Sequence, residues 1–93
     1  MRSIERTRAF KRNYRRESRG RYGDRLDERL APVVTALAND IPLAPHHHDH
    51  ALSVPWADFR DCHVRPDLVL IYEQVGRGLL RLVRLGSHAK LGL

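Results

Sequence analysis

An α+β fold is predicted for this chain by two changes of pattern along its sequence. Residues 2–6 are compatible with a short strand, and helical spacing of apolar residues follows in the first half. After a loop that contains Pro42 and Pro45, the pattern changes to β-rich runs separated by turn residues. A chain of 93 residues is large enough for one modest core. We therefore expect one domain, residues 1–93, with a short N-terminal strand, two helices and an antiparallel β-meander, the helices packed on one face of the sheet.

A few residues near the N-terminus indicate the first strand and the first helix. Ile4 is expected to point inward from the strand, and Thr7 is a plausible N-cap for a helix over residues 8–19. Phe10 and Tyr14 are the only large apolar residues of that helix and lie one turn apart. Because this apolar face is narrow, we expect the helix to be largely exposed to solvent.

A second helical pattern begins at Asp24 and ends at Asn39 and Asp40. Its apolar residues recur at helical spacing: Leu26, Leu30, Val33, Val34 and Leu37. Pro32 interrupts the pattern, because a proline inside a helix removes a hydrogen bond and clashes with the preceding turn. Either the helix kinks there or its regular part begins near Ala31, and the sequence leaves both possibilities open.

Three strands are predicted in the second half. Residues 59–64 form the first, and Pro66-Asp67 marks the turn that follows. Residues 68–72 are rich in β-branched and aromatic side chains and suit a central strand. Residues 76–78 supply a glycine-containing hairpin connection to the last strand, residues 79–85.

The positive charge is concentrated at one end of the chain. Residues 1–30 contain eleven basic and five acidic residues, whereas the remainder contains six of each, so the whole excess of +6 lies in the N-terminal third. Such a surface is expected to meet phosphate groups or an acidic protein. The plainer interpretation is a solvated helix face that keeps the protein soluble.

Composition also indicates the compartment. Cys62 is the only cysteine, so no disulfide forms within the chain, and a reducing cytoplasm is expected. The sequence contains neither a signal-peptide pattern nor an apolar run long enough to span a membrane, so we expect a soluble cytoplasmic protein that does not engage the membrane.

The residues most typical of chemistry lie in the second half. His50, His63 and His88 are separated in sequence and accompanied by Asp61 and Asp67. Imidazole both accepts and donates a proton near neutral pH, so these residues indicate proton transfer on an anionic substrate. Strand parity places Asp61 and His63 on one face and Arg60 and Cys62 on the other. If the first and last strands of the meander are near neighbours, Arg84 and His88 join Asp61 and His63 at one spot.

The same half of the chain resembles a known family. The matching segments are Asp49-His50, Trp56, Arg60-Asp61-Cys62-His63, Pro66-Asp67, Leu70-Ile71-Tyr72, Leu80-Arg81 and Gly86-Ser87-His88-Ala89. In residue type and spacing, these segments resemble the YafQ branch of the RelE/ParE toxin superfamily. The resemblance is dense over residues 40–91 and covers the N-terminal helices by pattern only.

The resemblance implies a toxin of a type II toxin–antitoxin module. Such toxins are ribosome-dependent endoribonucleases that cut mRNA, and a cognate antitoxin, here expected to be acidic, neutralises them. The resemblance implies catalytic roles for His50, His63, Asp67 and His88, with Asp61 beside them. Gly92 stands where the family often has an aromatic residue that stacks on an mRNA base, so codon preference does not transfer.

Cleavage of RNA without a metal or other cofactor requires a base, an acid and support for the developing phosphorane charge. The base would remove the ribose 2′-hydroxyl proton, and the oxygen would attack the adjacent phosphate. We expect His50 or His63 to be the base and His88 the acid that protonates the leaving oxygen. Asp61 and Asp67 would orient an imidazole or raise its pKa. The expected substrate-binding residues are Arg60, Arg81 and Arg84.

Several plainer interpretations compete with these expectations. The run His46-His47-His48-Asp49-His50 contains zinc-ligand types, but no cysteine pair supports a four-ligand site, so we expect no resident metal. Cys62 is expected to be buried, and Trp56 and Tyr72 to belong to the core. The alternative interpretation of Asp61 is a strand-edge ion pair with Arg60. The alternative functions are a non-catalytic binding protein of the RelE/ParE fold, such as a gyrase inhibitor or a ribosome-binding module, and a metal-dependent nuclease.

Overall fold

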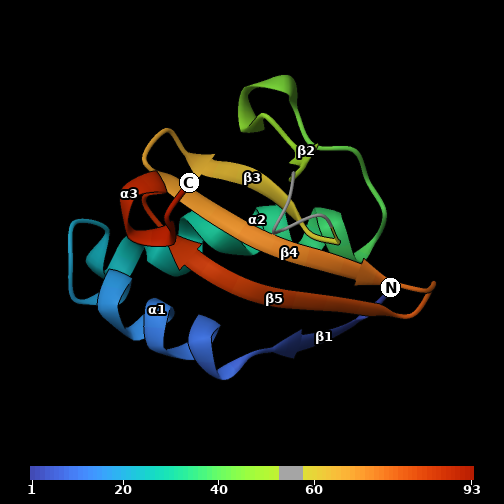
Figure 1. The fold of residues 1–93 in the computed structure, drawn as a ribbon, viewed down its shortest axis with the longest axis horizontal. Helices are drawn as coiled ribbons and strands as arrows, with labels where there is room; N and C mark the ends of the chain where they lie inside the picture. Colours follow the sequence, from blue (N-terminus) through green and yellow to red (C-terminus); the bar gives the residue numbers. More distant parts are fainter. Residues whose placement is uncertain (53–57) are drawn as a thin grey trace.

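The computed structural model of the chain describes residues 1–52 and 58–93, so Trp56 lies outside the described residues (Figure 1). Its helices and strands, in chain order, are β1 (Ser3–Arg6), α1 (Arg8–Ser18), α2 (Leu26–Ala38), β2 (His50–Ala51), β3 (Arg60–Arg65), β4 (Leu68–Val75), β5 (Leu79–Gly86) and α3 (His88–Leu91). Two short 3₁₀ helices, η1 (Gly23–Arg25) and η2 (Pro45–His47), precede α2 and β2.

The five strands form one mixed sheet in the order β1-β5-β4-β3-β2. β1 runs parallel to β5, and every other neighbouring pair is antiparallel. The predicted α+β fold, with its N-terminal strand, two helices and meander, is confirmed. The short strand β2 and the terminal helix α3 are additions that the sequence did not predict.

Two apolar clusters lie on opposite faces of the sheet. The larger one joins α1 and α2 to alternate residues of β4 and β5, including Leu68, Leu70 and Tyr72, which are all buried. The smaller one lies on the other face, where Leu91 of α3 packs near Val69 and Ile71. The two long helices therefore share one face, as predicted, while α3 covers one end of the opposite face (Figure 1).

Helix α1 begins as predicted, because the Thr7 side chain accepts a hydrogen bond from the Phe10 backbone N–H at 3.0 Å. Its inward face is more polar than expected, since Asn13 and Glu17 are buried beside Phe10. The rest of the helix is largely exposed, as predicted. Ile4 lines a cleft with Phe10 and Leu82 on the side of the sheet that carries the helices, but it remains 41% exposed.

Helix α2 continues through Pro32 without interruption, so the alternative of a start near Ala31 is wrong. Pro32 is exposed, while Leu30 and Val33 on either side of it are buried. On the solvent side of a helix, water can bond to the carbonyl that the proline leaves without its helical donor.

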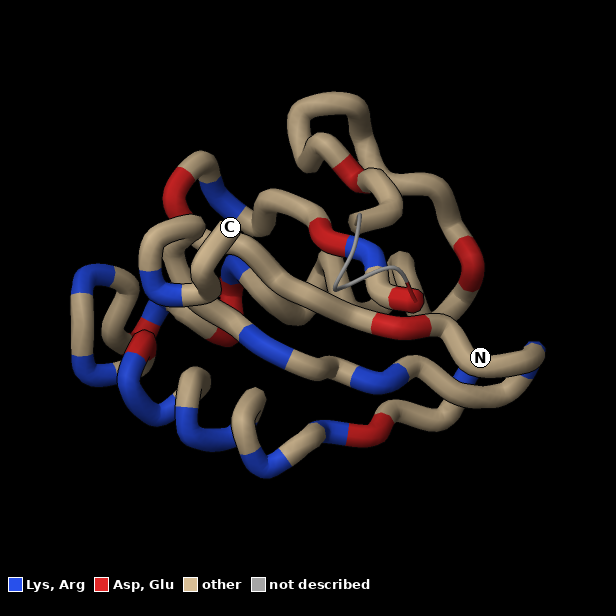
Figure 2. The backbone as a smooth tube through the Cα atoms, in the orientation of Figure 1, with Lys and Arg blue, Asp and Glu red and all other residues tan. Residues whose placement is uncertain are grey.

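Lys and Arg residues are concentrated along α1 and the turn that follows it (Figure 2). The described part of the chain contains no helix that is both long and apolar enough to cross a membrane.

Candidate active site

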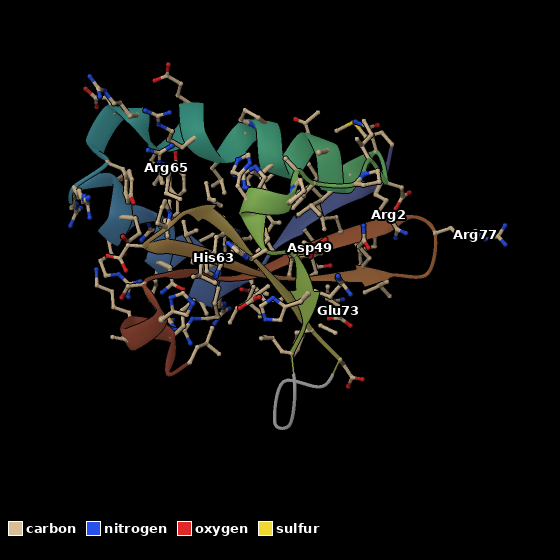
Figure 3. All side chains as sticks on the ribbon, turned by 90° about the horizontal axis from the view of Figure 1, so that it is seen from above. Arg2, Asp49, His63, Arg65, Glu73 and Arg77 are labelled. Carbon is tan, nitrogen blue, oxygen red and sulfur yellow. The ribbon has the colours of Figure 1, made fainter. Side chains whose placement is uncertain are left out.

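The open face of β3 holds the predicted site. Asp61 and His63 are two residues apart on β3, opposite Ile71 and Val69 of β4. Residues two apart on a strand point to the same face, so both side chains lie on the side that α1 and α2 do not cover. The labelled His63 lies in the middle of the molecule in Figure 3.

His88 reaches His63 from the end of β5. It is the first residue of α3, whose N-cap Ser87 accepts a hydrogen bond from the Lys90 backbone N–H at 3.2 Å. The His63 and His88 ring centroids are 4.8 Å apart, with the ring planes at 74°. The expected approach of these two residues is therefore found, although β4 separates the strands that carry them.

The β2 segment contributes His50, which pairs with Asp61 across the two strands. His50 Nδ1 lies 3.1 Å from Asp61 Oδ1 and 2.7 Å from the carbonyl oxygen of His48. A carbonyl oxygen only accepts, so Nδ1 carries the proton and donates it to His48. The buried Asp61 Oδ1 thus has the His50 ring close by but receives no hydrogen bond from the described residues.

Burial raises the pKa of the Asp61 carboxyl above its ordinary value. The positive forms of His50, His63 and His88 oppose that shift, which places all three imidazoles within electrostatic reach of one carboxylate. Asp61 does not pair with Arg60, so the expectation of a simple strand-edge ion pair is wrong. Arg60 instead lies 3.3 Å from Asp49 Oδ1, measured from its Nε.

The pKa of His63 is lowered, first by burial and then by the nearby charge of His88. Asp61 acts in the opposite direction, and the charges of His48 and His50 lower the pKa of His63 further. His63 is therefore biased toward the neutral imidazole at neutral pH.

His48 is the member that sequence reasoning missed. Its ring centroid lies 5.2 Å from that of His63, and its backbone is left-handed, with φ of 47° at the end of η2. The signal that was available is the run of imidazoles directly before Asp49-His50. We call His48, His50, His63 and His88, together with Asp61, the histidine cluster.

Four other predicted site residues lie outside the histidine cluster. Asp67 is in the exposed β3–β4 turn, with its Oδ2 4.0 Å from Arg21 Nη1. Arg60 contacts Asp49 and the Tyr72 hydroxyl, near the face that packs on the helices. Because Arg84 Nε donates to Asn13 Oδ1 of α1 at 2.8 Å, its guanidinium does not join His63 and His88 as expected.

Arg81 is on the open face but is already engaged. Its guanidinium donates to Glu5 of β1 and Glu73 of β4, each at 3.0 Å. These two hydrogen bonds raise the pKa of Arg81, with the Glu5 bond as the larger cause. Arg81 thus links β5 to its two neighbouring strands, β1 through Glu5 and β4 through Glu73.

Two expectations about the core are confirmed. Cys62 is fully buried, and burial raises the pKa of its thiol far above the ordinary value. The Tyr72 ring is buried in the larger cluster, and its hydroxyl donates to Asp49. Within the described ranges, no group of three or more His, Cys, Asp or Glu side chains is arranged to hold a metal ion.

Comparison with known proteins identifies the family. The model of a family described as a bacterial toxin of type II toxin–antitoxin systems, YafQ, matches residues 2–92. The mRNA interferase toxin YafQ of Escherichia coli (strain B / BL21-DE3) is 42% identical over 64 residues, which cover 68% of each chain. The putative toxin YafQ of Haemophilus influenzae is 40% identical over 71 residues, 73% of this chain and 70% of that protein.

Solved structures agree with this match. The metal-bound toxin from Helicobacter pylori superposes with a TM-score of 0.87 at 38% identity, covering 98% of this chain and 99% of that one. A chain of the E. coli DinJ-YafQ complex superposes with a TM-score of 0.81 at 34% identity, covering 98% of both. Because the family model spans nearly the whole sequence and these relatives share its fold, the chain belongs to the YafQ family of bacterial toxins of type II toxin–antitoxin systems.

Proposed function

We propose that this YafQ-family toxin, an mRNA interferase like its curated relatives, cuts ribosome-bound mRNA by metal-independent acid–base chemistry at the histidine cluster. One observation carries the chemical part of the proposal. His50 presents Nδ1 to the buried carboxylate of Asp61 at 3.1 Å, on the face where His63 and His88 meet. A carboxylate beside a proton-carrying imidazole is the arrangement that stabilises the ring when it takes up a second proton.

His50 is the base in this proposal. Because its Nδ1–H is directed at the His48 carbonyl, the neutral ring carries its lone pair on Nε2. Nε2 removes the proton from the ribose 2′-hydroxyl, and the Asp61 carboxylate stabilises the imidazolium that forms. The His50 side chain is 55% exposed, so a ribose can reach it, whereas the Asp61 side chain is only 3% exposed.

His88 is the acid, and His63 is a hydrogen-bond donor to the phosphate. The 2′-oxygen forms a bond to phosphorus, the bond from phosphorus to the 5′-oxygen breaks, and His88 gives its proton to that oxygen. The products are a 2′,3′-cyclic phosphate and a 5′-hydroxyl. His63, biased toward the neutral form, donates a ring N–H to a phosphate oxygen as charge develops there.

Four predicted site residues lie outside the histidine cluster and move no protons in the proposal: Asp67, Arg60, Arg81 and Arg84. The arginines add positive charge around the substrate, and Asp67 belongs to the turn that borders β3. A net charge of +6, concentrated over α1 and the next turn, supports contacts with the phosphates of mRNA and ribosomal RNA (Figure 2).

The proposed protein partner is a cognate acidic antitoxin. An E. coli relative is seen in a complex, DinJ-YafQ. In the proposal, a helix or tail of the antitoxin covers His50, His63 or His88 and excludes RNA, and the toxin acts in the cytoplasm, where ribosomes are. Purified antitoxin should therefore abolish cleavage in stoichiometric amounts.

The test is primer extension on ribosome-bound message, which detects new 5′ ends within codons. We expect His50→Gln and His88→Gln to cut at least about 100-fold more slowly, since each proton-transfer group contributes roughly two to four powers of ten. His46→Gln is the matched control, because its ring stacks on His47 (centroids 4.1 Å apart) and it is not in the histidine cluster. Message without ribosomes should stay intact.

Two results would contradict the proposal. Cleavage at the parental rate by His50→Gln and His88→Gln would remove the histidine cluster from the chemistry. Growth arrest that persists unchanged in both variants would favour the non-catalytic binding protein. A transition-metal chelator, added with Mg²⁺ retained for the ribosomes, should leave the rate unchanged, whereas loss of cleavage would favour the metal-dependent nuclease.

A further inference from the structure

A basic cleft lies beside the β3–β4 turn and has no role in the proton transfers. Its volume is about 330 Å³, and it lies between the α1–α2 connection, α2 and the end of β3. Four arginines line it, Arg21, Arg25, Arg29 and Arg65, against a single carboxylate, Asp67. Concave surfaces lined by charge of one sign concentrate ions of the opposite sign.

Three of these guanidinium groups are free to bind a ligand. The side chains of Arg25, Arg29 and Arg65 make no hydrogen bond or ion pair within residues 1–52 and 58–93. Arg81 and Arg84 differ, because they have protein acceptors at 2.8 to 3.0 Å. Three arginines without protein acceptors among the described residues therefore lie in the same cleft.

The remaining pair in the cleft is weak. Arg21 Nη1 and Asp67 Oδ2 are 4.0 Å apart, with their side chains 77% and 65% exposed. An exposed ion pair at that separation contributes little, so an incoming phosphate competes readily for Arg21. Arg21 also lies over the Tyr22 ring, 5.9 Å from its centroid, which keeps the guanidinium at the mouth of the cleft.

The cleft is continuous with the surface around the histidine cluster. Arg29 and Arg65 also line a second cleft of about 400 Å³, whose wall includes His47 and His63. His47 Nδ1 donates to the His63 carbonyl at 2.6 Å, which joins η2 to β3 at that wall. The second cleft, whose lining also includes Glu28, therefore extends from two of these arginines to the edge of β3 at His63.

We propose that the cleft of Arg21, Arg25, Arg29 and Arg65 binds the phosphate backbone of single-stranded RNA, several nucleotides away from the bond that is cut. The inference rests on the proposed function, which identifies the bound RNA as mRNA. It gives the arginines a role in RNA binding that is separate from catalysis. Guanidinium groups bind phosphate oxygens in a bidentate manner, which suits a backbone that passes with no particular sequence.

The experiment measures binding without cleavage. The probe is a fluorescently labelled single-stranded RNA whose 2′-hydroxyls are methylated, so it cannot be cut, and the readout is anisotropy over a range of salt concentrations. The full-length Arg25→Gln/Arg65→Gln double variant should bind more weakly. Its slope of log affinity against log salt should be shallower by about 1.4, because each phosphate contact on a single strand contributes about 0.7.

A matched control separates the cleft from net charge. Arg6→Gln/Arg77→Gln removes the same two charges from exposed positions outside α1 that make no side-chain hydrogen bond or ion pair within the described ranges. Arg77 and Arg65 lie at opposite ends of the molecule in Figure 3. This control should keep the parental slope to within about half a contact. Both double variants should melt at the parental temperature, because none of the four side chains has a hydrogen-bond or ion-pair partner among the described residues.

Three outcomes would overturn the proposal. An equal loss in the control pair would show that binding follows net charge and not the cleft. Loss of binding to duplex RNA with retention of the single strand would assign the cleft to a structured RNA. Loss of binding to a poly-glutamate peptide, with RNA unaffected, would assign it to an acidic protein.

The two proposals fail separately. His50→Gln should bind the methylated RNA with the parental affinity while its cleavage of ribosome-bound message falls. If His50→Gln cut at the parental rate while the arginine pair lost RNA binding, the catalytic proposal would fall and the cleft would stand. If cleavage followed the histidines but the arginine pair bound normally, the reverse would hold.

Discussion

The imidazole rings of His63 and His88 are 4.8 Å apart, centroid to centroid, and close to perpendicular. Two imidazoles this close resist being positively charged together, so protonation of one lowers the pKa of the other. That coupling is visible at His63, where the charge of His88 is second only to burial in lowering the pKa. His63 is therefore biased toward the neutral ring, the form in which the proposal has it donate a hydrogen bond to the phosphate.

Removal of the neighbouring charges should move the His63 titration in predictable directions. His88→Gln and His48→Gln remove charges that lower the pKa of His63, so each should raise it, while Asp61→Asn should lower it. Ring chemical shifts followed by NMR against pH report each value. An unchanged His63 titration in all three variants would contradict the coupling.

The same shift affects stability in acid. Because the folded pKa of His63 lies below the unfolded value of about 6.5, the unfolded chain binds the proton more readily. Stability should therefore fall as pH drops from about 6.5 through the folded pKa of His63. His88→Gln should lessen that fall, as measured by urea unfolding at a series of pH values.

Asp61→Asn should stabilise the protein while it slows cleavage. The Asp61 carboxylate is buried, and its Oδ1 lacks a hydrogen bond from the described residues. Burial disfavours the charged carboxylate more than a neutral amide, so Asp61→Asn should raise the free energy of unfolding at pH 7. For a domain of this size, each 1 kcal/mol gained corresponds to a rise in Tm of about 4–8 °C.

The pH dependence of this gain follows from the raised pKa of Asp61. Its folded pKa lies above the unfolded value, so the penalty of the charged carboxylate is fully present above the folded pKa. It disappears as pH falls below the unfolded value near 3.8. The Tm difference between Asp61→Asn and the parent should shrink over the same range, and a difference that persists in acid would point to a cause other than charge.

The fold was predictable where local chemistry and the required structure agree. Thr7 has the side chain of an N-cap and serves as one, and residues 68–72 have the composition of a central strand and form one. Asp61 and His63 were predicted to share a face, because side chains two residues apart on any strand point to the same side. The approach of His63 to His88 needed the resemblance, since sequence alone does not state which strands are neighbours.

The rest depended on tertiary contacts that no local pattern encodes. Asn13 and Glu17 are polar, yet both are buried, because Asn13 meets Leu85 of β5 and Glu17 meets Lys90 of α3. Arg84 shares the expected parity, yet its long side chain reaches Asn13 instead of the open face. His48 enters the histidine cluster through a left-handed backbone at the end of η2, which no helical or strand periodicity of the sequence indicates.

Asn13→Ala should destabilise the protein through two lost hydrogen bonds. Asn13 Oδ1 accepts from Arg84 Nε at 2.8 Å and from the Leu85 backbone N–H at 3.0 Å. The Leu85 N–H is buried, so leaving it without an acceptor should cost about 1–3 kcal/mol by urea unfolding. Arg84→Gln is the control: it keeps the Leu85 bond and should cost less. Equal losses would show that the Arg84 contact dominates.

The last prediction concerns Gly92, at whose position the family resemblance implies an aromatic residue. Gly92 ends α3 with a left-handed backbone, φ 72°, and its N–H donates to the Ala89 carbonyl at 3.2 Å. A side chain built there meets no atom within 4 Å, so the only obstacle is the backbone conformation. Gly92→Ala should therefore cost about 1–2 kcal/mol of stability.

Gly92→Phe should carry the same strain and add a ring that is able to stack on a base. Stacking contributes about 1–3 kcal/mol per base, so Gly92→Phe should bind single-stranded RNA about 5-fold or more tightly than Gly92→Ala. Comparing these two variants cancels the strain, and anisotropy with methylated RNA measures the difference. Equal affinities would mean that the end of α3 lies away from the RNA, and that glycine at this position weakens no contact with the message.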